Sequence, residues 1–435
     1  MASTEVKTGI HTSPEAARRL ARRYRQEAFF QFMGLIAIVL ALSALAWLMA
    51  SIFGTGLSAF RQHEVQITAS LDPELIDPER TGDPEVMRRG DYRTILQRAI
   101  YDRFPEAADD RKLRLQLMEV YSVAGGTGFL RDFVLDNPGR VGDTVTLWIP
   151  ASDDVDQMLK GKFDLDVPQE LRKVTDVQIA WVRELQASGE LRASFNKILF
   201  LNTDSRDPEL AGVAAAVVGS FYALLVTFVL SFPMGVAAAI YLEEFAPKNR
   251  FTDFIEVNIN NLAAVPSIVF GLLGLAVFLN FFGLPRSAPL VGGMVLALMT
   301  LPTIIIATRA SLKAVPPSIR EGALGVGASK LQSIYHHVLP LAMPGILTGT
   351  IIGMAQALGE TAPLLMIGMV AFVTQIPESI TTPASALPVQ VFLWSDSPER
   401  AWEERTSAAI IILLGFLTLM NLVAVLLRSR FERRW

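Results

Sequence analysis

Six apolar runs limit the folds open to this 435-residue chain more than any other feature. A helix of about 20 predominantly apolar residues crosses the roughly 30 Å of bilayer hydrocarbon and satisfies its own backbone hydrogen bonds there. The composition agrees, since 51% of the residues are hydrophobic and only 19% are charged. We therefore predict an all-α polytopic membrane protein with six transmembrane helices, near residues 29–53, 211–241, 265–282, 290–308, 343–372 and 408–427.

Basic residues flank the first and last of these runs. They are Arg18, Arg19, Arg22, Arg23 and Arg25 before the first run and Arg428, Arg430, Arg433 and Arg434 after the last. Because flanking Lys and Arg favour the cytosolic side, we expect a cytosolic N-terminal segment (1–28) and a cytosolic basic tail (429–435). An even number of spans permits both. No small-residue cleavage site is evident, so the first run is predicted to be a retained anchor.

A polar stretch at residues 54–209 lies between the first and second runs, on the extracytoplasmic side of this topology. It is long enough to bury its own core. Alternating apolar and polar residues predict strands at 63–72 and 144–150, with a third strand at 195–201. Helical spacing of apolar residues predicts helices at 91–104, 111–124 and 176–191. We therefore expect a small α+β insert.

The insert contains no catalytic constellation, since G-x-S-x-G, H-E-x-x-H and paired cysteines are absent from its sequence. It is mildly acidic, and an acidic surface repels anions rather than gathering them. The cluster Gly125-Gly126-Thr127-Gly128 is interpreted as a turn. The insert is predicted to be a structural or docking module for a partner outside the membrane.

The rest of the composition excludes several other roles. The chain has no cysteine and four scattered histidines, so we expect no metal site and no bound cofactor. No sequence of the form G-x4-G-K-[ST] is present, so the chain cannot hold ATP in that way. A second polypeptide must supply any ATP-derived energy. Nucleic acid is not an expected partner.

A polar, helix-prone segment, EGALGVGASKLQSIYHHVLP, occupies residues 321–340 between the fourth and fifth runs. It resembles the EAA loop (roughly EAA-x3-G-x9-I-x-LP) of bacterial ABC-transporter permeases, with Gly in place of the first Ala and His337 where the family usually has Ile. The resemblance implies a short coupling helix within residues 314–340 that docks on a cytoplasmic ATPase. The implied docking residues are Glu321, Gly322, Ala323, Gly327, Leu339 and Pro340. The charge distribution independently places this loop in the cytosol.

Four further segments resemble one branch of that family, the A-type membrane subunit of the phosphate-specific ABC importer. They are VPSIVFGLLGL (265–275), ALGETAPLL (357–365), ALPVQVFLWSDSPE (386–399) and LLRSRFERRW (426–435). The resemblance implies a type I importer permease domain at residues 210–428, in a bacterial inner membrane. The implied partners are a second related permease, a dimeric ATPase and an extracytoplasmic phosphate-binding protein. The long insert departs from the family's compact members.

Glu360 is the charged residue to explain within the fifth run. An ionised carboxylate in hydrocarbon costs at least about 2.5 kcal/mol unless it is paired or hydrated. Pro363 is expected to kink the helix, and irregular backbone at that depth must face protein or a water-filled cavity. Glu360 and Thr361 are therefore predicted to line the substrate pathway, by pairing with an arginine or by donating a hydrogen bond as a neutral carboxyl. The alternative is a structural glutamate that joins two helices.

Two other residues bear on the charge of that pathway. The resembled family often reads R-A-x-G-E, with the arginine implicated in phosphate passage, whereas Gln356 occupies that position here. A cation would then come from elsewhere, such as the paired subunit, although Gln356 still offers two amide donors. Arg309, just after the fourth run, is the other candidate cation. It could instead be a positive-inside anchor that snorkels to the interface.

Two functional alternatives stay open on the sequence. A permease for another oxyanion, such as sulfate or molybdate, would share this fold. A non-transporting membrane sensor or scaffold of phosphate signalling would use the insert to bind its partner. The coupling-type loop argues against the scaffold, because a scaffold has no need to contact an ATPase.

Overall fold

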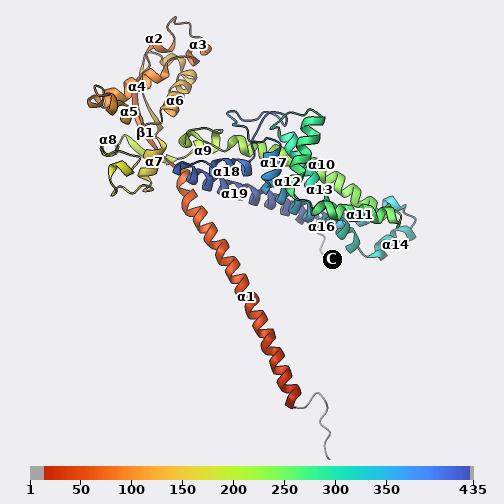
Figure 1. Cartoon of the computed structure of the whole chain (residues 1–435). Coiled ribbons are helices and arrows are strands. Elements are labelled where there is room, and N and C mark those ends of the chain that lie inside the picture. Colours follow the sequence, from red (N-terminus) through yellow and green to blue (C-terminus); the bar gives the residue numbers. More distant parts are fainter. Residues whose placement is uncertain (1–13, 432–435) are drawn as a thin grey trace, which may run out of the picture. The chain divides into compact units, whose positions relative to one another are not determined.

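The computed structural model describes residues 14–431, and the chain divides into two compact units, Met1–Gly54 and Thr55–Trp435. The first unit holds nearly all of α1 (Pro14–Gly56), one uninterrupted helix of 43 residues (Figure 1). The helix contains the expected first span, and its large apolar side chains, such as Phe30 and Trp47, are exposed. A helix that is apolar on every side suits a lipid environment rather than water.

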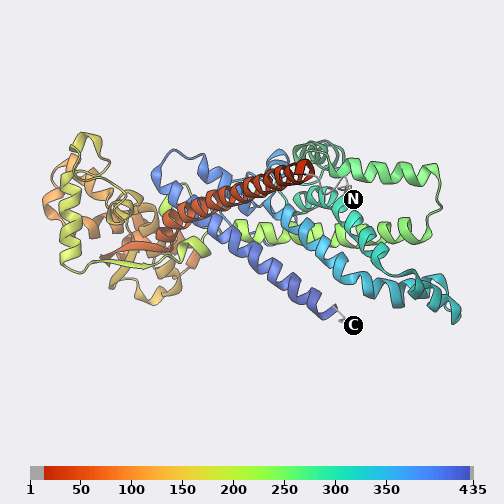
Figure 2. The ribbon, with the colours of Figure 1, turned by 90° about the horizontal axis from the view of Figure 1, so that it is seen from below.

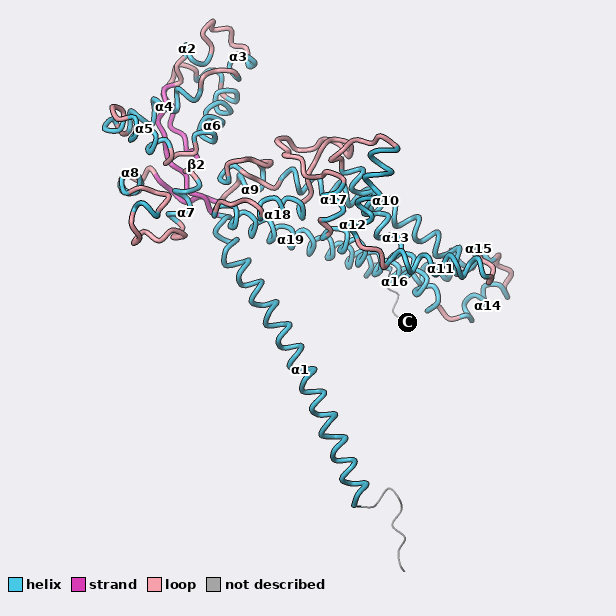
Figure 3. Tube along the Cα trace, in the orientation of Figure 1, coloured by secondary structure: helices cyan, strands magenta, loops and turns pink. Residues whose placement is uncertain are grey.

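The insert is built around a three-stranded antiparallel sheet of order β2-β1-β3 (Figure 3). The central strand β1 (Arg61–Ser70) pairs with β2 (Thr144–Pro150) and with β3 (Leu191–Phe195). From Val65 onward alternate residues of β1 are buried (Val65, Ile67 and Ala69), as the period of a strand requires. Together with apolar residues of the helices they form one core. The helices are α2 (Pro73–Ile76), α3 (Pro84–Arg88), α4 (Tyr92–Arg103), α5 (Arg111–Met118), α6 (Val123–Asp136), α7 (Asp153–Leu159), α8 (Asp176–Ala187) and α9 (Ile198–Leu201).

The predictions for β1, β2 and α4 are confirmed, but the helix expected at 111–124 is wrong beyond Met118. The Ser122 hydroxyl accepts a hydrogen bond from the Gly125 N–H and caps a new helix, α6. The glycines interpreted as a turn lie inside that helix. A Cβ at Gly126 would come 2.8 Å from a methyl group of Leu96, so the glycine serves close packing rather than chain reversal.

The strand expected at 195–201 is also wrong, because β3 ends at Phe195 and the following residues form α9. Asn196 decides the change of structure. Its side-chain oxygen accepts a hydrogen bond from the Leu199 N–H, and its amide donates to the Ala59 carbonyl. The predicted helix at 176–191 is four residues too long, since α8 ends at Ala187 and Gly189, at φ +76°, turns the chain into β3.

The rest of the second unit is a bundle of apolar helices that run alongside one another (Figure 2). Small residues let the helices approach closely, as is usual in membranes. A Cβ at Gly293 of α13 would lie 2.5 Å from Val226 of α10, and one at Gly349 of α16 would lie 2.1 Å from the Ala307 Cβ. The helices are α10 (Ala214–Ile240), α11 (Arg250–Ala263), α12 (Ser267–Leu273), α13 (Pro289–Ala314), α14 (Pro317–Gly325), α15 (Lys330–Ser333), α16 (Leu339–Gly359), α17 (Ala362–Met366), α18 (Leu387–Ser395) and α19 (Arg400–Phe431).

Five helices of the described residues are long and apolar enough to cross a membrane, and six if one bent pair counts as a span. The bent pair joins α11 to α12 and its π-helical continuation, Gly274–Phe281, at an angle of 104°. This pair contains the expected third span. The fifth span differs from its prediction, because its helix runs from Lys330 to Gly359 and stops at Glu360.

A polar seam joins the insert to the first turns of α19. Lys160 donates to Glu404 and to Asp156, with Nζ–O distances of 2.7 Å, and Gln157 also donates to Glu404. The Nδ1 atom of His63 lies 2.8 Å from Asp156. These charges are almost fully buried, so removing one partner leaves another without compensation. The insert is thus fixed to the last long helix of the bundle.

Glu209, at the same seam, predicts a pH dependence of stability. The side chain is 7% exposed and accepts a hydrogen bond from the Ser122 hydroxyl at 2.6 Å. Burial raises its pKa from 4.5 to about 7. The folded state therefore favours the protonated carboxyl, and this stabilisation is complete below pH 4.5 and is lost as the pH rises through about 7. The shift corresponds to about 3 kcal/mol.

We expect Glu209→Gln to raise the thermal unfolding midpoint more at pH 8 than at pH 5. The measurement is a thermal melt of the purified full chain at both pH values. Glu170→Gln, at an exposed residue of the insert, is the matched control. An equal effect of Glu209→Gln at the two pH values would contradict the prediction.

Candidate functional site

The segment predicted to dock on an ATPase begins with a short helix, α14. Pro316 is the N-cap residue and Pro317 opens the first turn, where the missing N–H of proline has no intrahelical partner to lose. This helix lies within the segment 314–340 that was expected to hold the coupling helix. Ala323 is the one buried residue of α14, while Glu321 and Gly322 are exposed.

Gly327 ends this helix through its backbone conformation. Its φ is +90°, and the N–H groups of Ala328 and Gly327 donate to the carbonyls of Ala323 and Leu324 at 3.1 and 3.0 Å. This is the Schellman arrangement, in which glycine follows the helix and takes the left-handed conformation. Ser329 then caps α15 in a reciprocal arrangement with Gln332. The predicted coupling segment is therefore a helix–turn–helix, and Leu339 and Pro340 start α16 rather than ending a helix.

Two glycines of this loop provide a matched pair of substitutions. Gly327→Ala should destabilise the turn by roughly 1–2 kcal/mol, because a Cβ is unfavourable at positive φ. Gly322→Ala should be neutral or stabilising, since Gly322 lies within α14 and a Cβ there would meet nothing within 4 Å. We expect limited proteolysis to cut the loop faster in Gly327→Ala and no faster in Gly322→Ala. Equal cleavage of the two variants would contradict the role of Gly327 as the residue that ends α14 at positive φ.

The loop also exposes large apolar side chains that the sequence analysis did not identify. They are Leu324 at 50%, Val326 at 87%, Leu331 at 55% and Tyr335 at 55% exposure. We call these four residues with Glu321 the loop face. Large apolar side chains exposed on a polar segment are typical of protein-binding surfaces. The sequence did contain a signal for these four residues, because bulky apolar side chains stand there in a segment that is too polar to span a membrane.

Arg320 fastens α14 to the membrane helices. Its guanidinium donates to Glu244 at 2.7 and 3.0 Å, and to the carbonyls of Val315 and Leu312 at 2.8 Å. Glu244 lies in the π-helical turn Tyr241–Phe245 that continues α10, and its side chain is only 9% exposed. Arg320 therefore joins α14 directly to the end of α10.

Arg309, predicted as a pathway cation or a snorkelling anchor, is held by two carboxylates. Its Nη2 lies 2.6 Å from Glu256 of α11, and its Nε lies 3.4 Å from Glu243. The side chain is 15% exposed. Because two acidic groups balance this charge, Arg309 ties α13 to α11 and to the end of α10. The sequence could not show this, since the partners lie on two other elements.

Glu360 stands where α16 ends rather than inside a continuous helix. Its backbone is extended (φ −81°, ψ 118°), and α17 begins two residues later with Pro363 in its first turn. The expected break in the helix is confirmed, although it precedes the proline. Among residues 14–431 the half-buried Glu360 carboxylate has no hydrogen-bonding or ionic partner. Thr361 beside it is also half-buried.

Gln356 and Gly359 lie on an exposed side of the same helix end, and a Cβ at Gly359 would meet nothing within 4 Å. Glu360 and Arg309 are not brought together. Helix α16 passes α13 at Gly349 and Ala307, near Arg309, and Glu360 follows roughly 16 Å further along at 1.5 Å per residue. The candidate site residues thus form two groups, one at the loop and one at the break.

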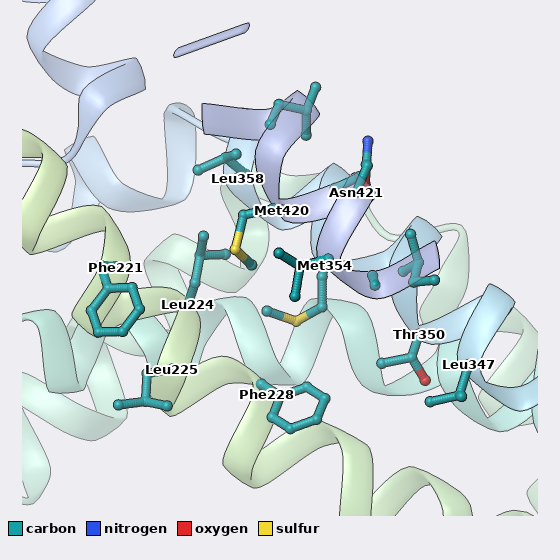
Figure 4. A pocket seen from close by; sticks show the side chains of 15 residues that line it. Phe221, Leu224, Leu225, Phe228, Leu347, Thr350, Met354, Leu358, Met420 and Asn421 are labelled. Carbon is teal, nitrogen blue, oxygen red and sulfur yellow. The ribbon is translucent and has the colours of Figure 1, made fainter. Parts of the chain in front are cut away.

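An apolar cavity of about 260 Å³ lies between α10, α16 and α19 (Figure 4). Phe221, Met354 and Met420 line it, and Thr350 and Asn421 are its polar members. The lining contains no charged group. A cavity of this chemistry does not suit an inorganic oxyanion, which requires hydrogen-bond donors or cations. The path of such a substrate therefore does not run through this cavity.

Two protein-family models match the chain. One, described as a binding-protein-dependent transport system inner membrane component, matches residues 231–435 and so includes both groups of candidate residues. The other, a domain of unknown function (DUF3333), matches residues 17–169. The helical bundle with its coupling-type loop therefore defines a membrane permease of the binding-protein-dependent transport class.

Similar proteins narrow that class. The phosphate transport system permease protein PstA of Yersinia pestis is 32% identical over 213 residues, which are 49% of this chain and 71% of that protein. PstA of Xylella fastidiosa is 31% identical over 235 residues, or 53% and 80%. The chain therefore belongs to the family of binding-protein-dependent transport permeases that includes these PstA proteins. The match to the probable ABC transporter permease YqgI of Bacillus subtilis, 34% identical over 155 residues, spans 35% of this chain and about half (52%) of that protein.

A solved structure of the MetNI methionine ABC transporter in an inward-facing conformation is also similar. It is 16% identical with a TM-score of 0.42, and the match covers 50% of this chain and 97% of that chain.

Proposed function

We propose that this chain is the A-type membrane subunit of an ATP-driven importer of inorganic phosphate. The observation that carries the proposal is the likeness to PstA proteins, at 31–32% identity over more than two thirds of their length. The geometry of the coupling loop supports it independently. The loop presents an exposed face and is fastened to two bundle helices, as a subunit driven by a separate ATPase requires.

In this proposal a dimeric ATPase binds the loop face. Closure of the ATPase on ATP displaces α14, and the Arg320–Glu244 pair passes the displacement to α10. The Arg309 pairs extend it to α11 and α13. The pathway then switches between access from the outside and access from the cytosol. The chain supplies motion and a path, while ATP is held by its partner.

We infer that a second, related permease completes the pathway at the break near Glu360. Gln356 and Gly359 open toward the outside of this chain, and Gln356 stands where the resembled family has an arginine. A cation from the second subunit would balance Glu360 there. With both termini cytosolic, the insert (54–209) would face the extracytoplasmic side beside a phosphate-binding protein, and residues 210–428 would form the permease domain in the bacterial inner membrane.

The test is uptake of radiolabelled phosphate by cells that depend on this chain, with excess sulfate or molybdate as competitors. We expect neither competitor to reduce uptake, and Glu321→Ala to abolish uptake while the protein stays in the membrane. Competition by sulfate or molybdate would indicate that oxyanion as the substrate. Normal uptake by Glu321→Ala would refute docking at this position.

A further inference from the structure

Three large apolar side chains are exposed close to one another at the edge of the insert. They are Phe195, Phe200 and Leu201, exposed by 60%, 38% and 68%, and we call them the aromatic foot. The rings of Phe195 and Phe200 stack with centroids 5.7 Å apart. Phe200 also contacts Phe60, again at 5.7 Å. Contact among themselves leaves their outer surfaces uncovered.

Backbone hydrogen bonds place this foot at the start of a membrane-length helix. The Val213 N–H donates to the Leu199 carbonyl at 2.9 Å, and the Ala214 N–H donates to the Asn202 carbonyl at 3.0 Å. The contact is tight, since a Cβ at Gly212 would lie 2.3 Å from the Asn202 oxygen. Helix α9 is therefore fastened to the first turn of α10, whose apolar span begins there.

The inner side of α9 belongs to the bundle. Leu199 is fully buried in a cluster with Ala211, Val213 and Trp402. The next two residues of the chain, Phe200 and Leu201, are exposed and therefore point away from the bundle at the same level. On the adjacent strand Phe195 pairs with Arg61, directly after the turn Leu57–Phe60 that follows α1. The foot thus lies where the chain passes between its apolar spans and the insert.

We propose that the aromatic foot inserts into the headgroup and upper acyl region of the bilayer leaflet on the insert's side. Aromatic side chains favour this boundary, because their rings are apolar and tolerate contact with polar groups. The foot continues the apolar surface of α10 beyond the span. Arg61 and Lys197, both exposed beside it, supply cations that lipid phosphates attract. Lipid contact here holds the insert at a fixed height, whatever substrate the permease carries.

The chain contains no cysteine, so a single introduced cysteine can be spin-labelled without a background. We would label Leu201→Cys in the full chain reconstituted in phospholipid nanodiscs, and measure collisions with oxygen, which enters lipid, and with a water-soluble nickel chelate. The matched control is Leu115→Cys on α5, a leucine of the insert that is 61% exposed. Phe195→Cys is a second reporter within the foot.

We expect the ratio of oxygen to nickel collisions to be several-fold higher at both foot positions than at residue 115. Equal ratios would overturn the proposal, because the foot would then be in water. Low collision rates with both reagents would also overturn it, since a protein surface rather than lipid would then cover the foot. Circular dichroism identical to that of the parent chain verifies that each labelled variant is folded.

Discussion

Arg320→Ala is expected to reduce ATP-driven phosphate uptake at least tenfold while the protein remains in the membrane. The substitution removes four hydrogen bonds at once, two to Glu244 and two to backbone carbonyls at the end of α13. It also leaves the Glu244 carboxylate, 9% exposed, without its cation. Breaking a buried pair on one side costs roughly 3–5 kcal/mol. Helix α14 would still be able to bind the ATPase, but Arg320 would no longer join it to the end of α10.

The readout separates docking from transmission. Uptake should fall, whereas co-purification of the ATPase with the variant should be unchanged, because Arg320 is not part of the loop face. Lys313→Ala is the matched control in the same charge cluster. Lys313 is 58% exposed and lies 3.5 Å from Glu243, and such exposed pairs contribute little. Normal uptake by the Arg320→Ala variant would contradict the proposed transmission of motion from α14 to α10. Loss of ATPase co-purification would instead indicate that Arg320 belongs to the surface that binds the ATPase.

Helices that the bilayer dictates could be predicted from sequence. An apolar run near 20 residues has few alternatives in hydrocarbon, so the runs at 211–241 and 290–308 correspond closely to α10 and α13. For Gly327 the sequence implied only a docking role, through the resemblance of the loop. Its conformation at φ +90°, which ends α14, became visible in the structure.

Predictions failed where distant residues decide the conformation. Gly125 and Gly126 of α6 pack against Leu210 and Leu96, and no local pattern distinguishes such packing from a turn. Asn196 converts an apparent strand into α9 by bonding to Ala59, which lies far away in the sequence. The partners of Arg309 come from two separate elements. The fifth span ends earlier than predicted for a local reason, because the helix stops at Glu360 and Thr361, where hydropathy alone would continue it.

Substitutions at Glu360 distinguish the two roles that a carboxylate can have in an anion pathway. Glu360→Ala should reduce uptake by at least tenfold, because truncating a charged partner in a desolvated site typically costs 2–5 kcal/mol, and about 1.4 kcal/mol already corresponds to tenfold. If Glu360 anchors an arginine of the second permease, Glu360→Gln should lose nearly as much, since the negative charge is gone. If it acts as a neutral donor, Glu360→Gln should keep most of the uptake, because the amide still donates.

Gln356→Arg in the Glu360→Gln background makes the distinction sharper. Residue 356 lies on an exposed side of α16, four residues before Glu360, and an arginine there would supply the cation that this chain lacks at that position. It should not restore uptake when Glu360 serves as an anchor, because two arginines would then face each other without a carboxylate. Cell-based phosphate uptake, normalised to membrane-inserted protein, is the measurement. Glu378→Gln, in the coil that follows α17, is the matched carboxylate control. Full uptake by Glu360→Ala would remove Glu360 from the pathway altogether.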